Sequence, residues 1–213
     1  MAVKRTIFIG ASEDRLEKLI EDRLKPGADK KTIDERIWDL FGEKWCVMFT
    51  DLSGFSRGVA KFGIIHFLQT IFESQRILVP CIDRHDGILL KSEGDSLFVI
   101  FRSVRKALDC SLAMQRTVRE YNRGRDDAEQ VLLCVGLGFG RMLRIGDHDV
   151  FGAEVNAAAK LGEDTARAWE ILVTGAVAEA GREVPGVSFT PIDTVPPGAE
   201  RAFRVMYALE RKP

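Results

Sequence analysis

Apolar residues follow two different periods along the chain, and these predict a domain of strands and helices. Cys46 to Phe49 is a short apolar run bounded by turn residues, which is typical of a buried strand. Gly87 to Phe101 holds two apolar runs separated by Ser92-Glu93-Gly94-Asp95, a pattern that predicts a tight β-hairpin. Further strands are predicted at 131–140, 141–145, 171–173 and 202–209, and a short one within 1–10.

Helical periodicity fills most of the remaining chain. Helices are predicted at 12–24, 32–41, 56–80, 104–121, 150–161 and 175–180, and residues 185–197 are predicted to be a loop. Pro80 predicts a kink through which the third helix continues to Ile82. Because hairpins and crossovers alternate, we expect an α/β (α+β) fold with a mixed, mostly antiparallel sheet covered by helices.

The length of 213 residues suits one domain of ordinary size with a substantial core. Residues 1–43 carry many charges but no chemical motif, so we predict an N-terminal helical segment that packs on the main domain or on a partner subunit. The main domain is predicted to span residues 44–213.

Charge and cysteine usage narrow the class of protein. The 31 basic residues nearly balance the 32 acidic ones, so no electrostatic footprint for nucleic acid or an anionic membrane is expected. No apolar run reaches bilayer length, and the start of the chain is too quickly charged for a secretory signal. The isolated cysteines lack C-x-x-C spacing and the three histidines lack ligand spacing, so we expect a cytoplasmic protein with reduced core thiols.

The first candidate for chemistry lies where the strand at 46–49 ends. Asp51 takes the position at which α/β sheets commonly place a ligand-binding carboxylate. The following residues Leu52, Ser53, Gly54 and Phe55 form a small turn whose backbone N–H groups could bind phosphate. An aspartate at such a place also serves as a helix cap or turn former.

The second candidate is Asp95, in the predicted hairpin. If the hairpin pairs beside the strand that ends at Asp51, the two carboxylates converge. Together with the carbonyl of Leu52 they offer the hard oxygen ligands that Mg²⁺ and Mn²⁺ prefer, and two such ions are a standard arrangement for nucleotidyl transfer. A plain turn aspartate is the alternative interpretation of Asp95.

The third candidate is a polar pair on a helix rich in alanine. Asn156 and Lys160 are four residues apart and therefore share one helix face. An amide and an ammonium among small residues indicate a polar site, and a solvated face is the alternative.

Three blocks of the sequence, FTDLSGFS, KSEGDSLFVIF and DVFGAEVNAAAKL, resemble in order and spacing the signature blocks of class III nucleotide cyclases. The resemblance covers roughly residues 44–175. It implies a ferredoxin-like fold and a homodimer, assembled head to tail, with active sites at the interface. It also implies a reaction in which the ribose 3′-hydroxyl of a nucleoside triphosphate attacks the α-phosphate and pyrophosphate leaves.

The resemblance assigns roles to particular residues. Asp51 and Asp95, with the carbonyl of Leu52, would hold two Mn²⁺ or Mg²⁺ ions per site. The turn Ser53, Gly54, Phe55 would hold the pyrophosphate. The remaining implied roles are base recognition by Lys91 and Asp149 of the opposite subunit, and orientation of the ribose by Asn156.

Two departures from the family pattern stand out. Lys160 occupies the position of the transition-state arginine and lacks its bidentate fork, and Arg141, Arg144 and Arg167 are left as possible substitutes. The segment between Gly140 and Asp149 is shorter than the hairpin arm of most class III cyclases. We therefore expect altered dimer contacts, with burial moved onto the N-terminal helices.

The residue pair expected to recognise the base does not determine which base the substrate carries. A donor at Lys91 and an acceptor at Asp149 fit adenine, uracil, cytosine and guanine alike. The small domain with its short arm resembles the pyrimidine cyclases of bacterial anti-phage (Pycsar-type) systems, whose cUMP or cCMP activates an effector. This resemblance favours UTP ahead of CTP, with ATP as an alternative. A degenerate, nucleotide-binding regulator is the non-enzymatic alternative, and retention of both metal aspartates argues against it.

Overall fold

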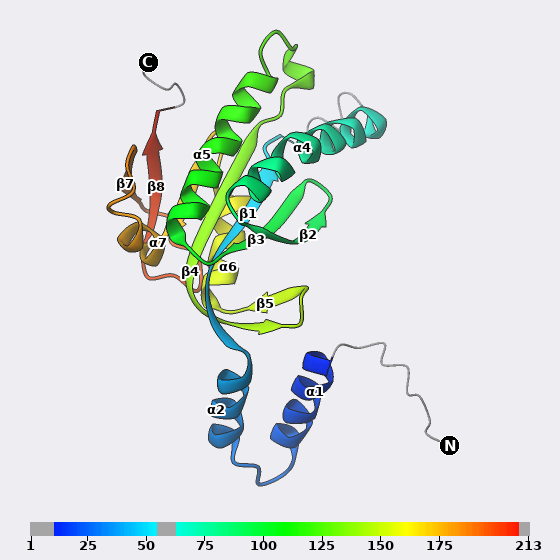
Figure 1. Cartoon of the computed structure of the whole chain (residues 1–213), viewed down its shortest axis with the longest axis vertical. Coiled ribbons are helices and arrows are strands. Elements are labelled where there is room, and N and C mark those ends of the chain that lie inside the picture. Colours follow the sequence, from blue (N-terminus) through cyan, green and yellow to red (C-terminus); the bar gives the residue numbers. More distant parts are fainter. Residues whose placement is uncertain (1–10, 55–62, 209–213) are drawn as a thin grey trace.

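A mixed sheet forms the centre of the molecule (Figure 1). The computed structural model describes residues 11–54 and 63–208. Strand β1 (Gly42–Leu52) lies between β3 (Ser96–Phe101) and β4 (Leu133–Ile145), and both pairings are antiparallel. The other strands are β2 (Ile88–Glu93), β5 (Asp149–Phe151), β6 (Ile171–Thr174), β7 (Val187–Ile192) and β8 (Ala202–Tyr207). Their order is β2-β3-β1-β4-β6-β8-β7, with β5 paired to β4, and only β4 and β6 run parallel among the pairings described. The predicted fold class is confirmed.

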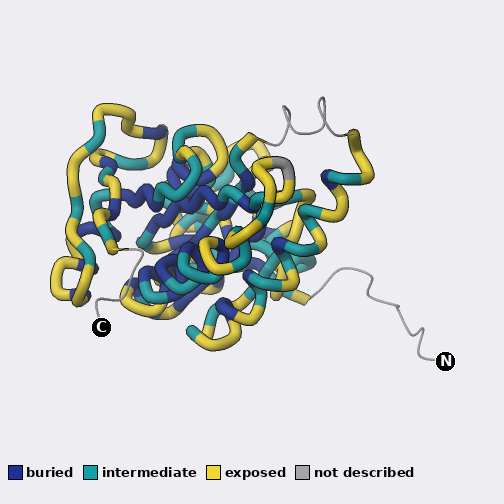
Figure 2. The backbone as a smooth tube through the Cα atoms, turned by 90° about the horizontal axis from the view of Figure 1, so that it is seen from above, coloured by how far each residue is buried: buried dark blue, intermediate teal, exposed yellow. Residues whose placement is uncertain are grey.

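Helices cover both faces of the sheet. Helices α4 (Ile64–Arg84) and α5 (Val104–Tyr121) pack side by side on one face (Figure 1), and α7 (Gly175–Ala180) joins the same core. The short helix α6 (Ala153–Ala159) packs on the other face, and a 3₁₀ turn, η1 (Asp127–Glu129), follows α5. Figure 2 shows the buried residues concentrated between these layers.

Strand β1 explains why the apolar run of the sequence is continuous. Cys46 and Met48 point into the core under α4 and α5, whereas Trp45 and Val47 point into the core on the α6 side. Side chains alternate along a strand, so a strand buried on both faces needs apolar residues at every position. Its buried position also fixes the register that brings Asp51 to the end of the strand.

Two strand predictions were wrong. Residues 131–140 and 141–145 were predicted as separate strands, but β4 is one strand, because β1 pairs with it from Gly42 opposite Leu143 to Leu52 opposite Leu133. Residues 185–197 were predicted as a loop but contain β7, which pairs with β8. An edge strand accepts Pro191, because a missing N–H on the outer side of the sheet costs no ladder hydrogen bond.

One predicted helix begins later than expected and changes type. Residues 150–161 were predicted as one helix, but β5 and Gly152 precede α6, which ends at Ala159. A π-helical turn, η2 (Lys160–Thr165), then continues the chain. Helix α4 runs through Pro80 to Arg84, as predicted. The predicted start of that helix and the predicted strand within residues 1–10 lie outside the described residues.

The N-terminal helices form a hairpin at one end of the molecule (Figure 1). Helix α1 (Ala11–Leu24) pairs with α2 (Lys30–Phe41) through an ion pair of 2.6 Å between Arg23 and Asp34. Leu19, Ile37 and Phe41 bury themselves against Ile145 at the end of β4. The helical segment therefore packs on the arm of the main domain, one of the two outcomes predicted for it.

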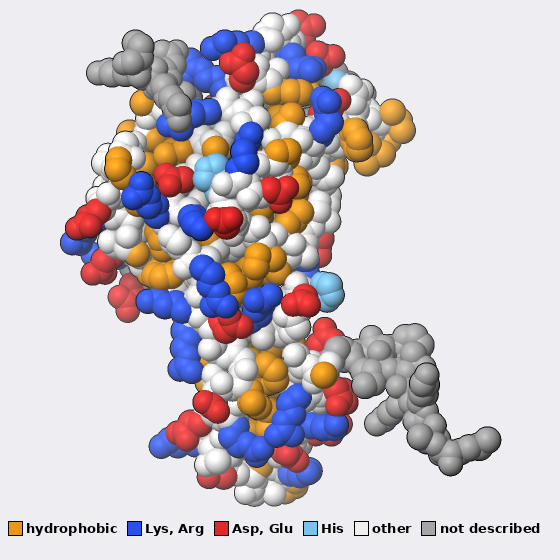
Figure 3. All heavy atoms as spheres, in the orientation of Figure 1, with side chains coloured by type: hydrophobic (Ala, Val, Ile, Leu, Met, Phe, Trp, Pro, Cys, Tyr) orange, Lys and Arg blue, Asp and Glu red, His pale blue; other side chains and the backbone are white. Residues whose placement is uncertain are grey.

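Basic and acidic side chains are interspersed over the face seen in Figure 3, in keeping with the near balance of charges along the sequence.

Candidate active site

The two candidate metal carboxylates converge at one edge of the sheet. Thr50 lies opposite Leu97, so the end of β1 meets the turn between β2 and β3. The Thr50 hydroxyl accepts a hydrogen bond of 3.1 Å from the Leu97 N–H and fixes that register. The side chains of Asp51 and Asp95 hydrogen-bond to each other, and the backbone N–H of Leu52 donates to both. The structure thus brings together the residues that the sequence placed in separate turns.

Burial perturbs both carboxyl groups, and the charge of Asp95 adds to its effect on Asp51. Burial first, and the charge of Asp95 second, raise the pKa of Asp51 to about 7, against the opposing effect of the Leu52 N–H. Burial also raises the pKa of Asp95. In the described chain no lysine or arginine forms an ion pair with either carboxylate. The pair therefore retains a proton more readily than two separate, exposed aspartates would.

The donor set suits a hard divalent cation. Paired carboxylates beside a backbone carbonyl are the oxygen ligands that Mg²⁺ and Mn²⁺ take in nucleotide-binding sites. Across residues 11–54 and 63–208, no three His, Cys, Asp or Glu side chains are grouped closely enough to hold a metal on their own. The two aspartates thus leave coordination positions for substrate oxygens.

The predicted phosphate turn needs a correction. The N–H of Ser53 is not free, since it donates to the carbonyl of Leu132 at 2.7 Å, and the N–H of Leu52 is engaged by the carboxylates. Gly54 adopts a left-handed conformation, with φ of 89°, which favours glycine. Phe55 lies outside the described residues. The pairing of β1 with β4 extends further than the sequence indicated, so the N–H of Ser53 is used in a hydrogen bond to the segment before β4.

The candidate base-recognition residues form an ion pair within one chain. Lys91 on β2 and Asp149 on β5 lie 2.6 Å apart, and each side chain is about one-third exposed (35% and 37%). The hydrogen bond from Lys91 to Asp149 raises the pKa of the lysine. A donor and an acceptor are therefore presented together by two strands that are distant in sequence.

Asn156 on α6 and Lys160 at the start of η2 are exposed to solvent, while Val155, Ala157 and Ala158 are buried. The N–H of Lys160 donates to the carbonyl of Asn156, so the two residues lie one turn apart as predicted, although the π-helical turn begins at Lys160. The ammonium group of Lys160 pairs with Asp164 at 2.5 Å, which raises the pKa of the lysine. The ammonium group of Lys160, predicted to take the place of an arginine, is thus paired with a neighbouring carboxylate.

Two of the three arginines considered as substitutes are engaged elsewhere. Arg141 donates to the carbonyl of Trp38 at 3.1 Å. Arg144 pairs with Asp147 and lies over the ring of Trp45, 5.1 Å from its centroid. Both belong to the arm and its contacts, whereas Lys160 lies directly after α6.

Sequence reasoning missed two glutamates. Glu154, in the first turn of α6, accepts hydrogen bonds from the Phe139 N–H (3.0 Å) and the Thr174 hydroxyl (2.6 Å), and so fixes α6 on the sheet. Glu163, on η2, contacts Ser96 beside Asp95. Both lie within or beside the third signature block, and Gly138 and Gly140, which face Glu154, were the available signal for that residue.

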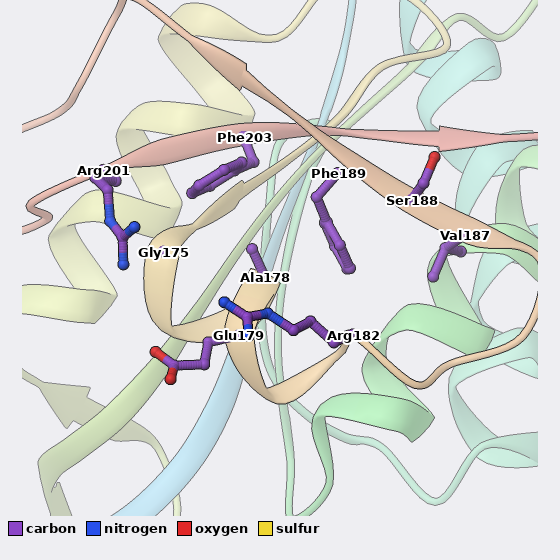
Figure 4. Close-up of a pocket in the computed structure, with 9 residues that line it drawn as sticks. All are labelled: Gly175, Ala178, Glu179, Arg182, Val187, Ser188, Phe189, Arg201 and Phe203. Carbon is purple, nitrogen blue, oxygen red and sulfur yellow. The ribbon is translucent and has the colours of Figure 1, made fainter.

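A hollow of about 310 Å³ lies between α7 and the β7–β8 pair (Figure 4). Arg182, Arg201 and Glu179 border it, with Phe189 and Phe203 behind them. None of the site residues predicted from the sequence lines it.

Comparison with known proteins identifies the family. The family described as "Adenylate and Guanylate cyclase catalytic domain" matches residues 42–209. The chain belongs to this family. The chain is therefore a nucleotide cyclase catalytic domain, and members of this family generally depend on Mg²⁺ or Mn²⁺.

Two curated relatives are similar over part of their length. A putative adenylate cyclase 3 of Rhizobium meliloti is 28% identical over 115 residues, or 54% of this chain and 19% of that protein. The serine/threonine-protein kinase pkn2 of Myxococcus xanthus is 29% identical over 131 residues, or 62% of this chain and 16% of that protein. The match thus spans less than a fifth of either relative.

A solved structure supports the fold. The adenylate/guanylate cyclase/hydrolase from Silicibacter pomeroyi superposes with a TM-score of 0.65 at 22% identity, covering 76% of this chain and 97% of that one. Within the described residues, no helix is both long and apolar enough to cross a membrane.

Proposed function

We propose that the protein is a metal-dependent cyclase that converts a nucleoside triphosphate to a 3′,5′-cyclic nucleotide and pyrophosphate. The observation that carries this proposal is the convergence of Asp51 and Asp95, unpaired with any described cation, in a chain of the nucleotide cyclase family. Two carboxylates with raised pKa values destabilise the metal-free protein and are expected where a cation binds.

The chemistry requires positioning more than covalent catalysis. Asp51 and Asp95 would hold the cations together with the carbonyl of Leu52, and Asp51 would give up its proton when they bind. A divalent cation held there would lower the pKa of the attacking 3′-hydroxyl and offset charge on the triphosphate. Lys160 would stabilise the charge that develops on the α-phosphate, and Asn156 would orient the ribose.

The site is proposed to be completed by a second copy of the chain. Lys91 and Asp149 would then bind the base of the nucleotide whose triphosphate lies at the partner's carboxylates. Gly54 and the side chain of Ser53 would lie near the pyrophosphate, although the N–H of Ser53 is consumed by the carbonyl of Leu132. The short β4–β5 arm and the helical hairpin packed on it would contribute to the dimer contact.

The substrate is proposed to be a pyrimidine nucleotide, with UTP ahead of CTP. The support is the resemblance in architecture to pyrimidine cyclases of anti-phage systems, because the donor–acceptor pair of Lys91 and Asp149 fits several bases. The product would then be a second messenger for defence that a cyclic-nucleotide-binding effector reads. ATP is the alternative substrate.

A competition assay tests both levels of the proposal. Purified protein is incubated with Mn²⁺ and an equimolar mixture of ATP, GTP, CTP and UTP, and the products are identified by mass spectrometry. We expect cUMP as the main product and no cyclic product from Asp51→Ala. A product from ATP alone would overturn the pyrimidine assignment, and no cyclic product at all would overturn the enzyme.

A nucleotide-binding regulator is the second candidate, favoured by one observation. Lys160 replaces an arginine and is bound by Asp164, so its charge is partly neutralised in the free protein. Saturable binding of a nucleotide in an equilibrium-binding measurement, with no cyclic product in the competition assay, would support the regulator.

A further inference from the structure

The turn that follows Lys160 is wound more widely than an α-helix. In η2 the N–H of Ala166 donates to the carbonyl of Leu161 at 2.8 Å, five residues back, and the Thr165 hydroxyl donates to the Lys160 carbonyl at 2.9 Å. Single π-helical turns are rare and occur frequently at functional sites, because the wider turn redirects side chains. Glu163 lies within this turn.

Close packing at Gly162 places this turn against the strand that carries Asp51. A Cβ added at Gly162 would lie 2.8 Å from both the Phe49 carbonyl oxygen and the Gly136 nitrogen, closer than real Cβ atoms approach. The backbone before Glu163 therefore lies directly on β1, two residues before Asp51. A larger residue at position 162 would lift the turn away from the carboxylate edge.

The side chain of Glu163 reaches the same edge. Its carboxylate accepts a hydrogen bond from Ser96, the residue after Asp95, and its charge acts on Asp51. The cation that could neutralise it, Lys160, is held by Asp164 at 2.5 Å. Three carboxylates thus face one edge, and among described residues none of the three forms an ion pair.

We propose that Glu163 is a positioning residue of the metal-binding edge, which strengthens divalent-cation binding by Asp51 and Asp95 through its charge and through its hydrogen bond with Ser96. Glu163 is not assigned as a direct ligand, because no group of three ligating side chains lies within metal-binding distance among the described residues. In metal sites, substitution of a group that orients the ligands from outside the ligand set typically weakens metal affinity by 10- to 100-fold. This inference rests on the proposed function for the identity of the site.

Direct measurement of Mn²⁺ binding tests it without relying on turnover. Free Mn²⁺ is followed by electron paramagnetic resonance during titration of wild type, Glu163→Gln, Ser96→Ala and the remote control Glu183→Gln. The Glu163→Gln variant keeps an acceptor for Ser96 and removes the charge, whereas Ser96→Ala removes the hydrogen bond and keeps the charge of Glu163. We expect about tenfold weaker binding for Glu163→Gln, a smaller loss for Ser96→Ala and no change for Glu183→Gln. Circular dichroism confirms that each variant is folded.

The outcomes separate this inference from the proposed function. Wild-type affinity in Glu163→Gln would overturn the inference, as would an equal loss in the Glu183→Gln control. If wild type binds Mn²⁺ and Glu163→Gln weakens it, but no nucleoside triphosphate is cyclised, the inference stands and the cyclase proposal fails. If wild type binds no Mn²⁺ at all, the inference fails.

Discussion

Replacing Asp51 by asparagine should stabilise the metal-free protein, and the gain should depend on pH. Burial and the charge of Asp95 raise the pKa of Asp51 from 3.8 to about 7, so the folded state holds this proton more tightly than the unfolded chain. The stability that the group contributes is therefore present below pH 3.8 and is lost as pH rises through 7. Asparagine mimics the protonated acid and does not ionise.

The magnitude follows from the same shift. Without screening by solvent, a pKa that rises by about three units corresponds to roughly 4 kcal/mol in the free energy of unfolding. Because Asp51 is only half-buried, solvent screening reduces this to about 1–2 kcal/mol. The advantage of Asp51→Asn over wild type should thus grow between about pH 4 and pH 7 and be constant above about pH 8.

Urea unfolding of both proteins in EDTA at pH 5, 6, 7 and 8 measures this difference. In an Asp95→Asn background the pH-dependent part should shrink without vanishing, because burial is the larger cause and the charge of Asp95 the smaller one. A free-energy difference that stays flat between pH 5 and pH 8 would refute the assignment of a raised pKa to Asp51.

Three further predictions concern Lys160, Lys91 and the packing of α6. Lys160→Ala should lower turnover at least tenfold in a steady-state assay, by loss of its charge at the transition state; activity near that of wild type would remove it from the site. Inactive Asp51→Ala and Lys91→Ala proteins, when mixed, should regain part of the activity if each site uses both subunits, and a mixture as inactive as its components would contradict the shared site. Gly136→Ala should destabilise the fold by about 1–3 kcal/mol in urea unfolding, because a Cβ there collides with the Ala158 carbonyl; unchanged stability would show that α6 can move away.

The convergence of Asp51 and Asp95 could be predicted from the sequence because both residues lie where regular elements end or begin. The apolar run before Asp51 and the hairpin signal around Asp95 fix two strand ends, and antiparallel pairing of those strands then forces the carboxylates together. The fold class followed from the same alternation of strands and helices.

Other features could not be predicted because they depend on contacts between distant segments. The pairing of β1 with β4 extends far enough to consume the N–H of Ser53, and no local pattern records its length. Glu163, which contacts Ser96, lies in a π-helical turn that no local pattern predicts. Gly162, which permits the close approach of this turn to β1, resembles an ordinary helix end in the sequence. Strand β7 was missed because Pro191 is compatible with a strand only at a sheet edge.

Phosphorus nuclear magnetic resonance of the reaction with UTP and Mg²⁺ tests the central claim most directly. Cyclisation at the edge formed by Asp51 and Asp95 predicts a cyclic phosphodiester and pyrophosphate in equal amounts, and neither product with Asp95→Asn. Formation of UDP and inorganic phosphate, or no reaction with any of the four nucleoside triphosphates, would contradict it.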